Sequence, residues 1–229
     1  QLICDFWEEA NQYDDDFGWD VDIDNDYILI GAPNRDINGY SNVGSAYLYY
    51  LDQSTGQCNL IQEISNPNIG TGSESYDLFG QNLTISNGHI YINGHDGPYG
   101  TLYHYIVDGF NITLSSNYSI PDNNTVYSIE SSDQYVAFGV PYFEYDNYPI
   151  SHGAIFVSPL GPITSPVTYA PSLDYLQGGE RFGVNNISFN DNYIVASSYG
   201  DNRKIAVFNI ENDESYLITT PEEFGINDY

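Results

Sequence analysis

Short apolar runs recur along this chain in a fixed order, and this repetition constrains the fold more than any other feature of the sequence. The runs are rich in Tyr, Ile, Val and Phe and are bounded by Gly, Asn, Asp, Pro or Ser, a pattern typical of β-strands. No apolar residues recur at helical spacing over a length that would support a helix. Four Phe-Gly pairs mark the starts of units: Phe17-Gly18, Phe79-Gly80, Phe182-Gly183 and Phe224-Gly225. Between the second and third of these pairs, the segment TVYSIE near residue 127 takes the place of a marker. Successive markers are 42 to 62 residues apart, a spacing typical of blades or solenoid turns.

Each unit contains four such runs, which we predict to form one small antiparallel sheet. In the first unit, YILIGAP (27–33), GSAYLYYL (44–51) and CNLIQEI (58–64) follow the marker. Small sheets with two apolar faces bury them by packing against neighbouring sheets. The sequence therefore predicts an all-β, β-propeller-like array of four complete four-stranded antiparallel blades plus partial terminal strands. We expect a single domain over 1–229, with units near 15–65, 77–120, 125–170 and 180–220 and terminal strands at 1–8 and 222–229.

The first strand of the first unit differs in pattern from the second. Asp20, Asp22 and Asp24 alternate there with Val21 and Ile23, whereas the next run is almost continuously apolar. Alternation is typical of a strand with one buried and one solvated face, and a continuous run is typical of a strand covered on both faces. We therefore predict that the three carboxylates face water.

The charge balance excludes one class of partner. The formal net charge is −28, with 4 Lys and Arg against 32 Asp and Glu. Binding to nucleic acid or to anionic lipid requires a basic patch, which this composition does not supply. No apolar stretch reaches the ~18–20 residues of a transmembrane helix, so we expect no membrane insertion. Dense carboxylates attract divalent cations or basic partners, or they act only as a solvated coat.

Several features favour secretion. The chain begins at Gln1 and contains no Met, which favours a processed chain whose signal peptide has been removed. Cys4 and Cys58 fit one disulfide in an oxidising compartment, and the alternative is a pair of buried free thiols. If a eukaryote secretes the chain, we expect glycan at several of its sequons: Asn82, Asn111, Asn117, Asn123 and Asn186. We predict a secreted, extracellular or cell-surface protein.

The segment from Phe17 to Pro33, FGWDVDIDNDYILIGAP, followed by Gly44-Ser45-Ala46-Tyr47, resembles the FG-GAP repeat, the blade of integrin-α-like β-propellers. The match is partial in the third unit, at Phe138-Gly139-Val140-Pro141, and only the Phe-Gly pair and the strand rhythm remain in the second and fourth. The resemblance covers about residues 15–229 and implies a propeller fold and an extracellular setting. It does not fix the function, because members range from adhesion receptors to structural proteins.

The two ends of the sequence carry incomplete units. LICDFW stands where the fourth strand of a unit is expected, and EEFGI begins a fifth unit. The terminal strands either close a ring within one molecule or pair head to tail between molecules, which builds a fibre when the contact does not close. In the second case, we expect these residues at the interface: Leu2, Ile3, Phe224, Gly225 and Ile226.

One loop has the spacing of a calcium site. Oxygen-bearing residues occupy alternate positions around Gly39: Asn34, Asp36, Asn38, the Tyr40 carbonyl and Asn42. Ser45 replaces the usual twelfth-position Glu, and a plain Asn/Gly hairpin explains the residues equally well. The FG-GAP resemblance implies a calcium loop between the first and second strands, where this chain has only the short turn Asp24-Asn25-Asp26. Ca²⁺ is thus the one cofactor that we consider.

No catalytic constellation is visible. No G-x-S-x-G motif is present. The chain has four histidines, and they do not show the spacing of metal ligands: His89, His95, His104 and His152. Paired carboxylates of a propeller glycosidase remain a remote alternative, because their pairing is spatial.

Tyrosines offer a further contact surface. We expect Tyr in strands to pack in the sheets, and Tyr142, Tyr145 and Tyr148 in a loop to be the better candidates for binding a sugar or another subunit. The sequence as a whole predicts a non-enzymatic extracellular structural or adhesive glycoprotein, with self-association or an extracellular protein or glycan as partner. The alternative is a calcium-dependent adhesin or lectin.

Overall fold

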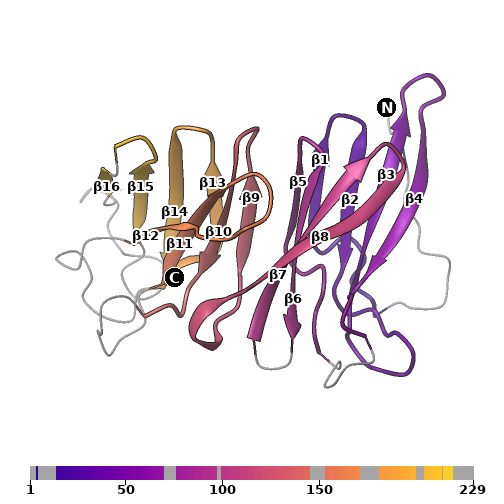
Figure 1. The fold of residues 1–229 in the computed structure, drawn as a ribbon, viewed down its shortest axis with the longest axis horizontal. Coiled ribbons are helices and arrows are strands. Elements are labelled where there is room, and N and C mark those ends of the chain that lie inside the picture. The colour runs from indigo at the N-terminus through magenta and orange to yellow at the C-terminus, as the bar shows by residue number, and fades with distance from the viewer. Residues whose placement is uncertain are drawn as a thin grey trace, which may run out of the picture.

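Four antiparallel sheets of four strands each make up the computed structural model of this 229-residue chain (Figure 1). The structure describes residues 4, 14–69, 76–96, 99–144, 153–170, 181–199, 204–212 and 214–218. The predicted all-β fold with four complete blades is therefore confirmed. The predicted terminal strands, with Leu2, Ile3, Phe224, Gly225 and Ile226, lie outside the described residues.

In every sheet the strands follow one another in chain order, each paired with the next. The first sheet contains β1 (Val21–Asp24), β2 (Tyr27–Ala32), β3 (Ser45–Asp52) and β4 (Gln57–Ser65). The second contains β5 (Leu83–Ser86), β6 (His89–Asp96), β7 (Tyr99–Asp108) and β8 (Asn111–Ser119). The third contains β9 (Ser128–Ser131), β10 (Tyr135–Val140), β11 (Ala154–Pro159) and β12 (Val167–Tyr169). The fourth contains β13 (Arg181–Phe189), β14 (Tyr193–Tyr199), β15 (Ile205–Asn209) and β16 (Ser215–Ile218).

Tight turns produce this up-and-down order. Asn87 and Gly88 form the two-residue turn between β5 and β6, and both have positive φ, at 48° and 74°. Asn and Gly tolerate this conformation, and such turns match the right-handed twist of the strands that they join. A short 3-10 turn, η1 (Pro121–Asn123), lies between the second and third sheets.

Three hydrophobic cores hold the four sheets together. The first core fills the space between the first and second sheets and includes Leu29, Leu48 and Ile90. The second joins sheets two and three, and the third joins sheets three and four. The sheets are thus stacked face to face along the chain (Figure 1). Their first strands lie beside one another in the order β1, β5, β9 and β13.

Close backbone contacts fix each sheet against the next. Phe79 donates its N–H to the carbonyl of Val43 over 3.0 Å, and Gly44 pairs with Phe79 in a short parallel bridge. A Cβ atom on Gly44 would lie 2.2 Å from the Phe79 carbonyl oxygen, and one on Gly31 would lie 2.1 Å from that of Gly80. Real Cβ atoms do not approach so closely. The glycines of one repeat therefore receive the Phe-Gly pair of the next, and we call this contact the clasp.

The same contact recurs between the third and fourth sheets. A Cβ atom on Gly139 would lie 2.3 Å from the Gly183 carbonyl oxygen, and one on Gly153 would lie 2.5 Å from that of Phe182. Ser128 also donates its hydroxyl to the Gly183 carbonyl over 3.0 Å. The glycine and Phe-Gly segments of the repeat are thus two halves of one contact between neighbouring blades.

The predicted orientation of the first strand is wrong. Asp20 and Asp22 point toward the second sheet, where their carboxylates accept hydrogen bonds from the backbone N–H groups of Leu83 and Ile85 at 2.8 and 2.7 Å. Val21 and Ile23 are instead each 59% exposed. The carboxylates face the neighbour because β5 is an edge strand whose outward N–H groups need acceptors.

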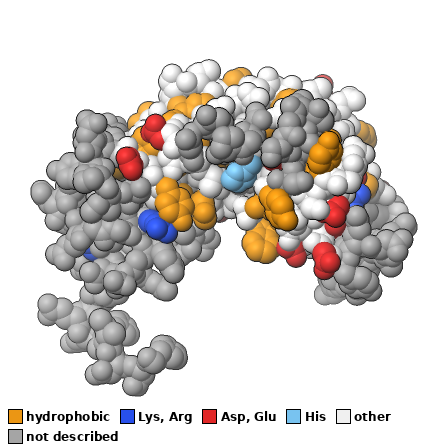
Figure 2. Space-filling view, turned by 90° about the horizontal axis from the view of Figure 1, so that it is seen from below, with side chains coloured by type: hydrophobic (Ala, Val, Ile, Leu, Met, Phe, Trp, Pro, Cys, Tyr) orange, Lys and Arg blue, Asp and Glu red, His pale blue; other side chains and the backbone are white. Residues whose placement is uncertain are grey.

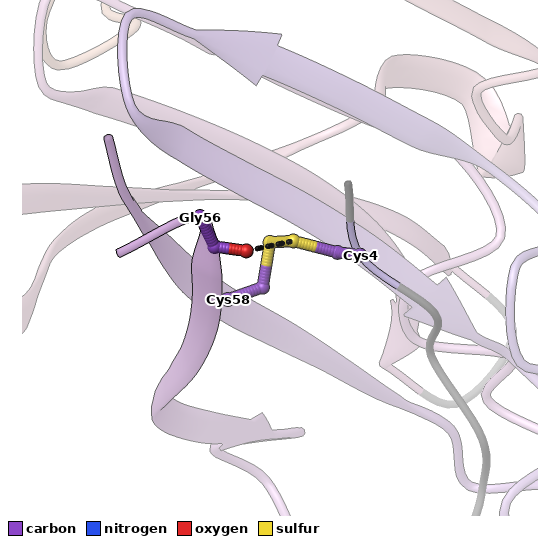
Figure 3. The surroundings of a disulfide bond; sticks show 3 residues. All are labelled: Cys4, Gly56 and Cys58. Atoms are coloured by element: carbon purple, nitrogen blue, oxygen red, sulfur yellow. Dashed lines mark hydrogen bonds between the residues drawn. A yellow bond between two sulfur atoms is a disulfide. The ribbon is translucent and has the colours of Figure 1, made fainter. Parts of the chain in front are cut away.

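A disulfide between Cys4 and Cys58 ties the start of the chain to β4 (Figure 3). The two Cα atoms are 5.9 Å apart, and 54 residues separate the cysteines in sequence. Closing a loop of this length limits the unfolded chain and stabilises the folded one by about 4 kcal/mol in the chain-entropy model.

Gly44→Ala tests the clasp against a matched control, Gly39→Ala. Both glycines have nearly the same φ, +86° and +87°, but a Cβ atom on Gly39 meets nothing within 4 Å. Both variants therefore carry the same conformational strain, and only Gly44→Ala adds the backbone collision. We expect Gly44→Ala to lose at least about 2 kcal/mol more unfolding free energy than Gly39→Ala in urea titrations. Equal losses would contradict the clasp.

Candidate functional site

A pocket lies where the first strands of the sheets meet, and we call it the axial pocket. Its volume is about 160 Å³. Residues from all four units line it: Trp19, Asp20, Gln81, Asn82, Ser128, Ile129, Glu130 and Ile187. Because the strands are stacked in an arc, residues more than 160 positions apart in sequence share this one cavity.

Some of the polar groups in the axial pocket are already hydrogen-bonded. Asp20 accepts from the N–H groups of Val21 and Leu83, one on each carboxylate oxygen. Ser128 donates to Gly183. By contrast, no described residue hydrogen-bonds to the side chains of four other lining residues: Trp19, Gln81, Asn82 and Glu130. These four lining residues therefore carry side-chain donors and acceptors that have no partner among the described residues.

Glu130 has an unusual electrostatic setting. Burial raises the pKa of its carboxyl to about 7, and the nearby charges of Asp22 and Asp20 raise it further in the same direction. The pKa of Asp20 is also raised, chiefly by burial, although its two backbone hydrogen bonds oppose that shift. Glu130 is thus a carboxyl group that changes charge near neutral pH, which is characteristic of functional sites and also of crowded carboxylates.

Glu130→Gln tests this setting. The pKa of the Glu130 carboxyl is about 7 in the folded protein, against an ordinary value of 4.5. Above pH 7 the charged carboxylate therefore lowers the unfolding free energy, whereas below pH 4.5 the carboxyl is protonated in both states and this cost is absent. We expect the variant to gain unfolding free energy on the order of 1 kcal/mol at pH 8, since solvent screens this partly exposed group. The gain should fade as the pH falls toward 4.5 in thermal unfolding. The exposed carboxylate Glu211 supplies the control, Glu211→Gln, and a gain independent of pH would contradict the assignment.

The first sheet leaves an apolar face open on the side away from the second sheet. Val21 and Ile23 alternate with the aspartates that bond to β5, so they point the opposite way. The cross-strand partner of Ile23 is Ile28 on β2. The partners continue through Tyr49 on β3 to Leu60 on β4, which is 52% exposed. Cross-strand partners share one face of a sheet, and these five residues therefore form one surface, the leading face.

The fourth sheet has a comparable open face at the other end of the stack. Ile194 and Ala196 point into the third core, so Val195 between them points away. Tyr193, Val195 and Ile205 are all exposed, and we call this surface the trailing face. On the face seen from below, exposed hydrophobic side chains form several separate groups (Figure 2). Among the described strands, no contact comparable to that of β9 with β13 joins β13 to β1.

Among the Phe-Gly pairs that the structure describes, Phe17-Gly18 is the one whose glycine is not enclosed by another repeat. A Cβ atom on Gly18 would meet nothing within 4 Å, whereas one on Gly80 would lie 2.5 Å from the Ser45 carbonyl oxygen. The Phe17 ring lies 5.3 Å from that of Tyr47, at the leading face. Gly18 also has a φ of +91°, as Gly80 does, so its backbone already has the conformation of a clasped glycine.

The predicted calcium loop forms a compact hairpin. Ile37 and Tyr40 exchange backbone hydrogen bonds around the turn at Asn38 and Gly39, and Asp36 accepts from the N–H of Asn42 at 2.9 Å. The Asn34 amide donates to Asp16, outside the hairpin. The described residues contain no group of three or more His, Cys, Asp or Glu placed to hold a metal ion. Ca²⁺ binding by amide and carbonyl oxygens in this loop stays a prediction.

The sequons lie in different surroundings. Asn111 and Asn117 are exposed on β8, the outermost strand of the second sheet, whereas Asn82 lines the axial pocket. Thr84, the third residue of that sequon, is buried and bonded to Asp22 and Ser131. The side chains of Asn123 and Asn186 lie outside the described residues.

The described histidines lie at two separate places in the second sheet. His89 and His104 stack with ring centroids 5.1 Å apart, and a hydrogen bond of 2.9 Å joins Nδ1 of His89 to Nε2 of His104. Burial lowers the pKa of His104 to about 4, with a smaller contribution from His89, so this pair is neutral at pH 7. His95 lies apart, 3.3 Å from the Thr125 hydroxyl, and His152 is outside the described residues.

One of the three loop tyrosines can be placed. The Arg181 guanidinium lies 4.4 Å from the ring centroid of Tyr142 and donates to its hydroxyl at 3.0 Å. Tyr127 packs edge-on against the same ring, 5.8 Å away. Tyr145 and Tyr148 lie outside the described residues. Tyr142 therefore joins the third and fourth sheets through a cation–π contact.

Sequence reasoning missed the axial pocket. One signal was available: Asp20, Asn82 and Ser128, which all line the pocket, occupy equivalent positions at the start of successive first strands, opposite Gly31, Asn93 and Gly139. A column of polar residues on equivalent strands indicates a shared polar surface. No single repeat shows it, because the column exists only after the blades are aligned.

Residues 11–49 match the FG-GAP repeat, which confirms the resemblance noted in the sequence. The matched segment contains Gly31 and Gly44, which form the clasp with the second sheet. It also contains Phe17-Gly18, the equivalent of the Phe-Gly pair that the clasp encloses. A comparison with curated proteins found no match. No helix in the described part of the chain is long and apolar enough to span a membrane.

Solved β-propeller structures resemble this fold at low sequence identity. The N10 neuraminidase-like protein of A/little yellow-shouldered bat/Guatemala/060/2010 is 12% identical with a TM-score of 0.51, over 86% of this chain and 57% of that one. Sqt1 of Saccharomyces cerevisiae is 11% identical with a TM-score of 0.51, over 90% of this chain and 48% of that one. The chain thus spans about half the length of these proteins, and at such identity the likeness shows the fold alone.

Proposed function

We propose that this protein is a non-enzymatic, secreted structural or adhesive glycoprotein whose copies join head to tail. The proposal rests on two apolar end faces: the leading face, beside which Gly18 lies open, and the trailing face at the far end of the stack. The fourth sheet has Ser197 where the first and third sheets have Gly31 and Gly139, so the contact between copies depends on these apolar faces and not on a second complete clasp. The inner sheets bury their apolar faces against neighbouring sheets. The two exposed end faces would bury their apolar residues in the same way by packing against another copy. Because the two end faces are different surfaces, their contact is heterologous and propagates when it does not close.

The charge distribution supports a second copy as the partner. A net charge of −28 disfavours binding to nucleic acid and to anionic membranes. Burial of apolar surface on association is greatest at the two apolar end faces. The same charge repels copies from one another at low ionic strength. Assembly should therefore become stronger as salt screens that repulsion.

Other features support an extracellular, non-enzymatic role. The Cys4–Cys58 disulfide is compatible with an oxidising compartment. Asn111 and Asn117 are exposed on an outer strand, where a glycan adds no steric conflict with the stack. The two oxygens of Asp20 and of Asp22 each accept a backbone hydrogen bond, which gives these two acids a structural role between the first and second sheets.

Gly18→Ala tests the proposal against Gly39→Ala. Both positions are open in the single molecule and have positive φ, so both variants should fold with similar unfolding free energy. If Gly18 packs against the trailing face of another copy, its new Cβ enters that contact, and association should weaken at least tenfold. Gly39→Ala should assemble as the original protein does. Sedimentation velocity over a concentration series, with electron microscopy of the largest species, measures both.

Two results would overturn the proposal. One is a protein that stays monomeric at high concentration and high salt. The other is assembly that Gly18→Ala leaves unchanged.

A further inference from the structure

We propose that the axial pocket binds the ring of a neutral saccharide. This inference concerns a different site from the end faces, although Trp19 follows Gly18 in the sequence, and its test does not require head-to-tail assembly. It rests on the size of the pocket, its free polar groups and the indole at its mouth.

The size of the axial pocket suits one six-membered ring. Its volume is about 160 Å³, and an engineered cavity of about 150 Å³ in another protein holds benzene. A single pyranose ring therefore fits, and a longer chain would have to extend out of the mouth. Most drug-sized pockets are larger, at about 300–1,000 Å³.

Four side chains that line the pocket have hydrogen-bonding groups without a described protein partner. Gln81 and Asn82 each offer a carbonyl oxygen and an NH₂ group, Trp19 offers an indole N–H, and Glu130 offers a carboxyl. Hydroxyl groups both donate and accept, so a ring with several hydroxyls can satisfy all four. A few convergent polar groups of this kind give small-molecule sites their specificity.

Trp19 supplies an apolar surface beside these polar groups. It lines the pocket and is also 59% exposed, which places it at the mouth. The C–H face of a pyranose is apolar and packs on an aromatic ring, while the indole N–H can bond a hydroxyl. A bound sugar ring would cover part of the exposed indole.

Other ligand classes fit less well. Asp20 and Glu130 repel anionic sugars and phosphates, as does the net charge of −28. A purely apolar ligand would leave the four polar groups unsatisfied. The described residues include no acid or histidine cluster placed to hold a metal ion. A neutral ring with hydroxyl groups is the class that meets the shape, the polarity and the charge together.

Fluorescence titration with methyl pyranosides tests the inference. The chain has two tryptophans, so Trp7→Phe leaves Trp19 as the single indole reporter. We expect at least one of the methyl glucoside, galactoside, mannoside or N-acetylglucosaminide to change Trp19 emission, with a Kd on the order of 1 mM. Sialic acid and glucosamine serve as anionic and cationic counterparts and should bind at least tenfold more weakly.

Variants locate the site by calorimetry. Trp19→Ala and Glu130→Ala should each weaken binding at least tenfold, and Glu130→Gln should restore most of it because the amide still bonds hydroxyls. Phe110→Ala, which removes an exposed aromatic ring outside the pocket, should leave binding unchanged. If Trp19→Ala fails to fold, Gln81→Ala takes its place.

Three outcomes would overturn the inference. They are no binding by any neutral pyranoside at 20-fold the expected Kd (about 20 mM), preferential binding of the cationic or anionic sugar, and binding that the pocket variants do not affect. Mass spectrometry of the secreted protein adds a separate test. A glycan on Asn82 would fill the pocket from within, so the inference requires that residue to be unmodified.

Discussion

The contact on which the structure depends is the approach of two backbones at glycine positions. The first sheet receives Phe79 and Gly80 at Gly44 and Gly31, where a Cβ atom would lie within about 2.2 Å of a carbonyl oxygen. Side chains cannot fit there, so the sheets meet at backbone distance near this point and at side-chain distance elsewhere. This fixes the angle between neighbouring sheets, and repetition of one angle makes the stack curve.

Hydrogen bonds to edge strands complete each interface. The N–H groups on the outer side of β5 would be unpaired in an isolated sheet, and the carboxylates of Asp20 and Asp22 accept them. Thr84 extends the chain of bonds to Ser131 on β9 at 2.7 Å. Glu130 occupies the register position of Asp22 but has one more methylene, and among the described residues its carboxyl has no donor. The position that binds the neighbouring strand in the first sheet is thus occupied in the third sheet by Glu130, whose carboxyl has no described partner and lines the axial pocket.

Much of the fold could be predicted from the sequence, because strand rhythm and turn residues are local. Asn87-Gly88 signals a tight turn, and the run at Tyr27–Ala32 signals a buried strand, whatever lies around them. The orientation of β1 could not be predicted. Alternation shows that two faces differ, but which face meets the next sheet depends on the unpaired N–H groups of β5. The axial pocket depends on the curvature of the whole stack, which joins Trp19 to Glu130 across 111 positions of sequence.

Amide hydrogen exchange at Leu83 and Ile85 tests most directly whether the sheets are joined in this way. Both amides lie on the edge of their own sheet and are bonded only by the carboxylates of the sheet before it. The account predicts that they exchange as slowly as the amides inside β6, and that both are released together when the clasp is broken by Gly44→Ala. Exchange at the rate of solvent-exposed amides in the original protein would contradict it.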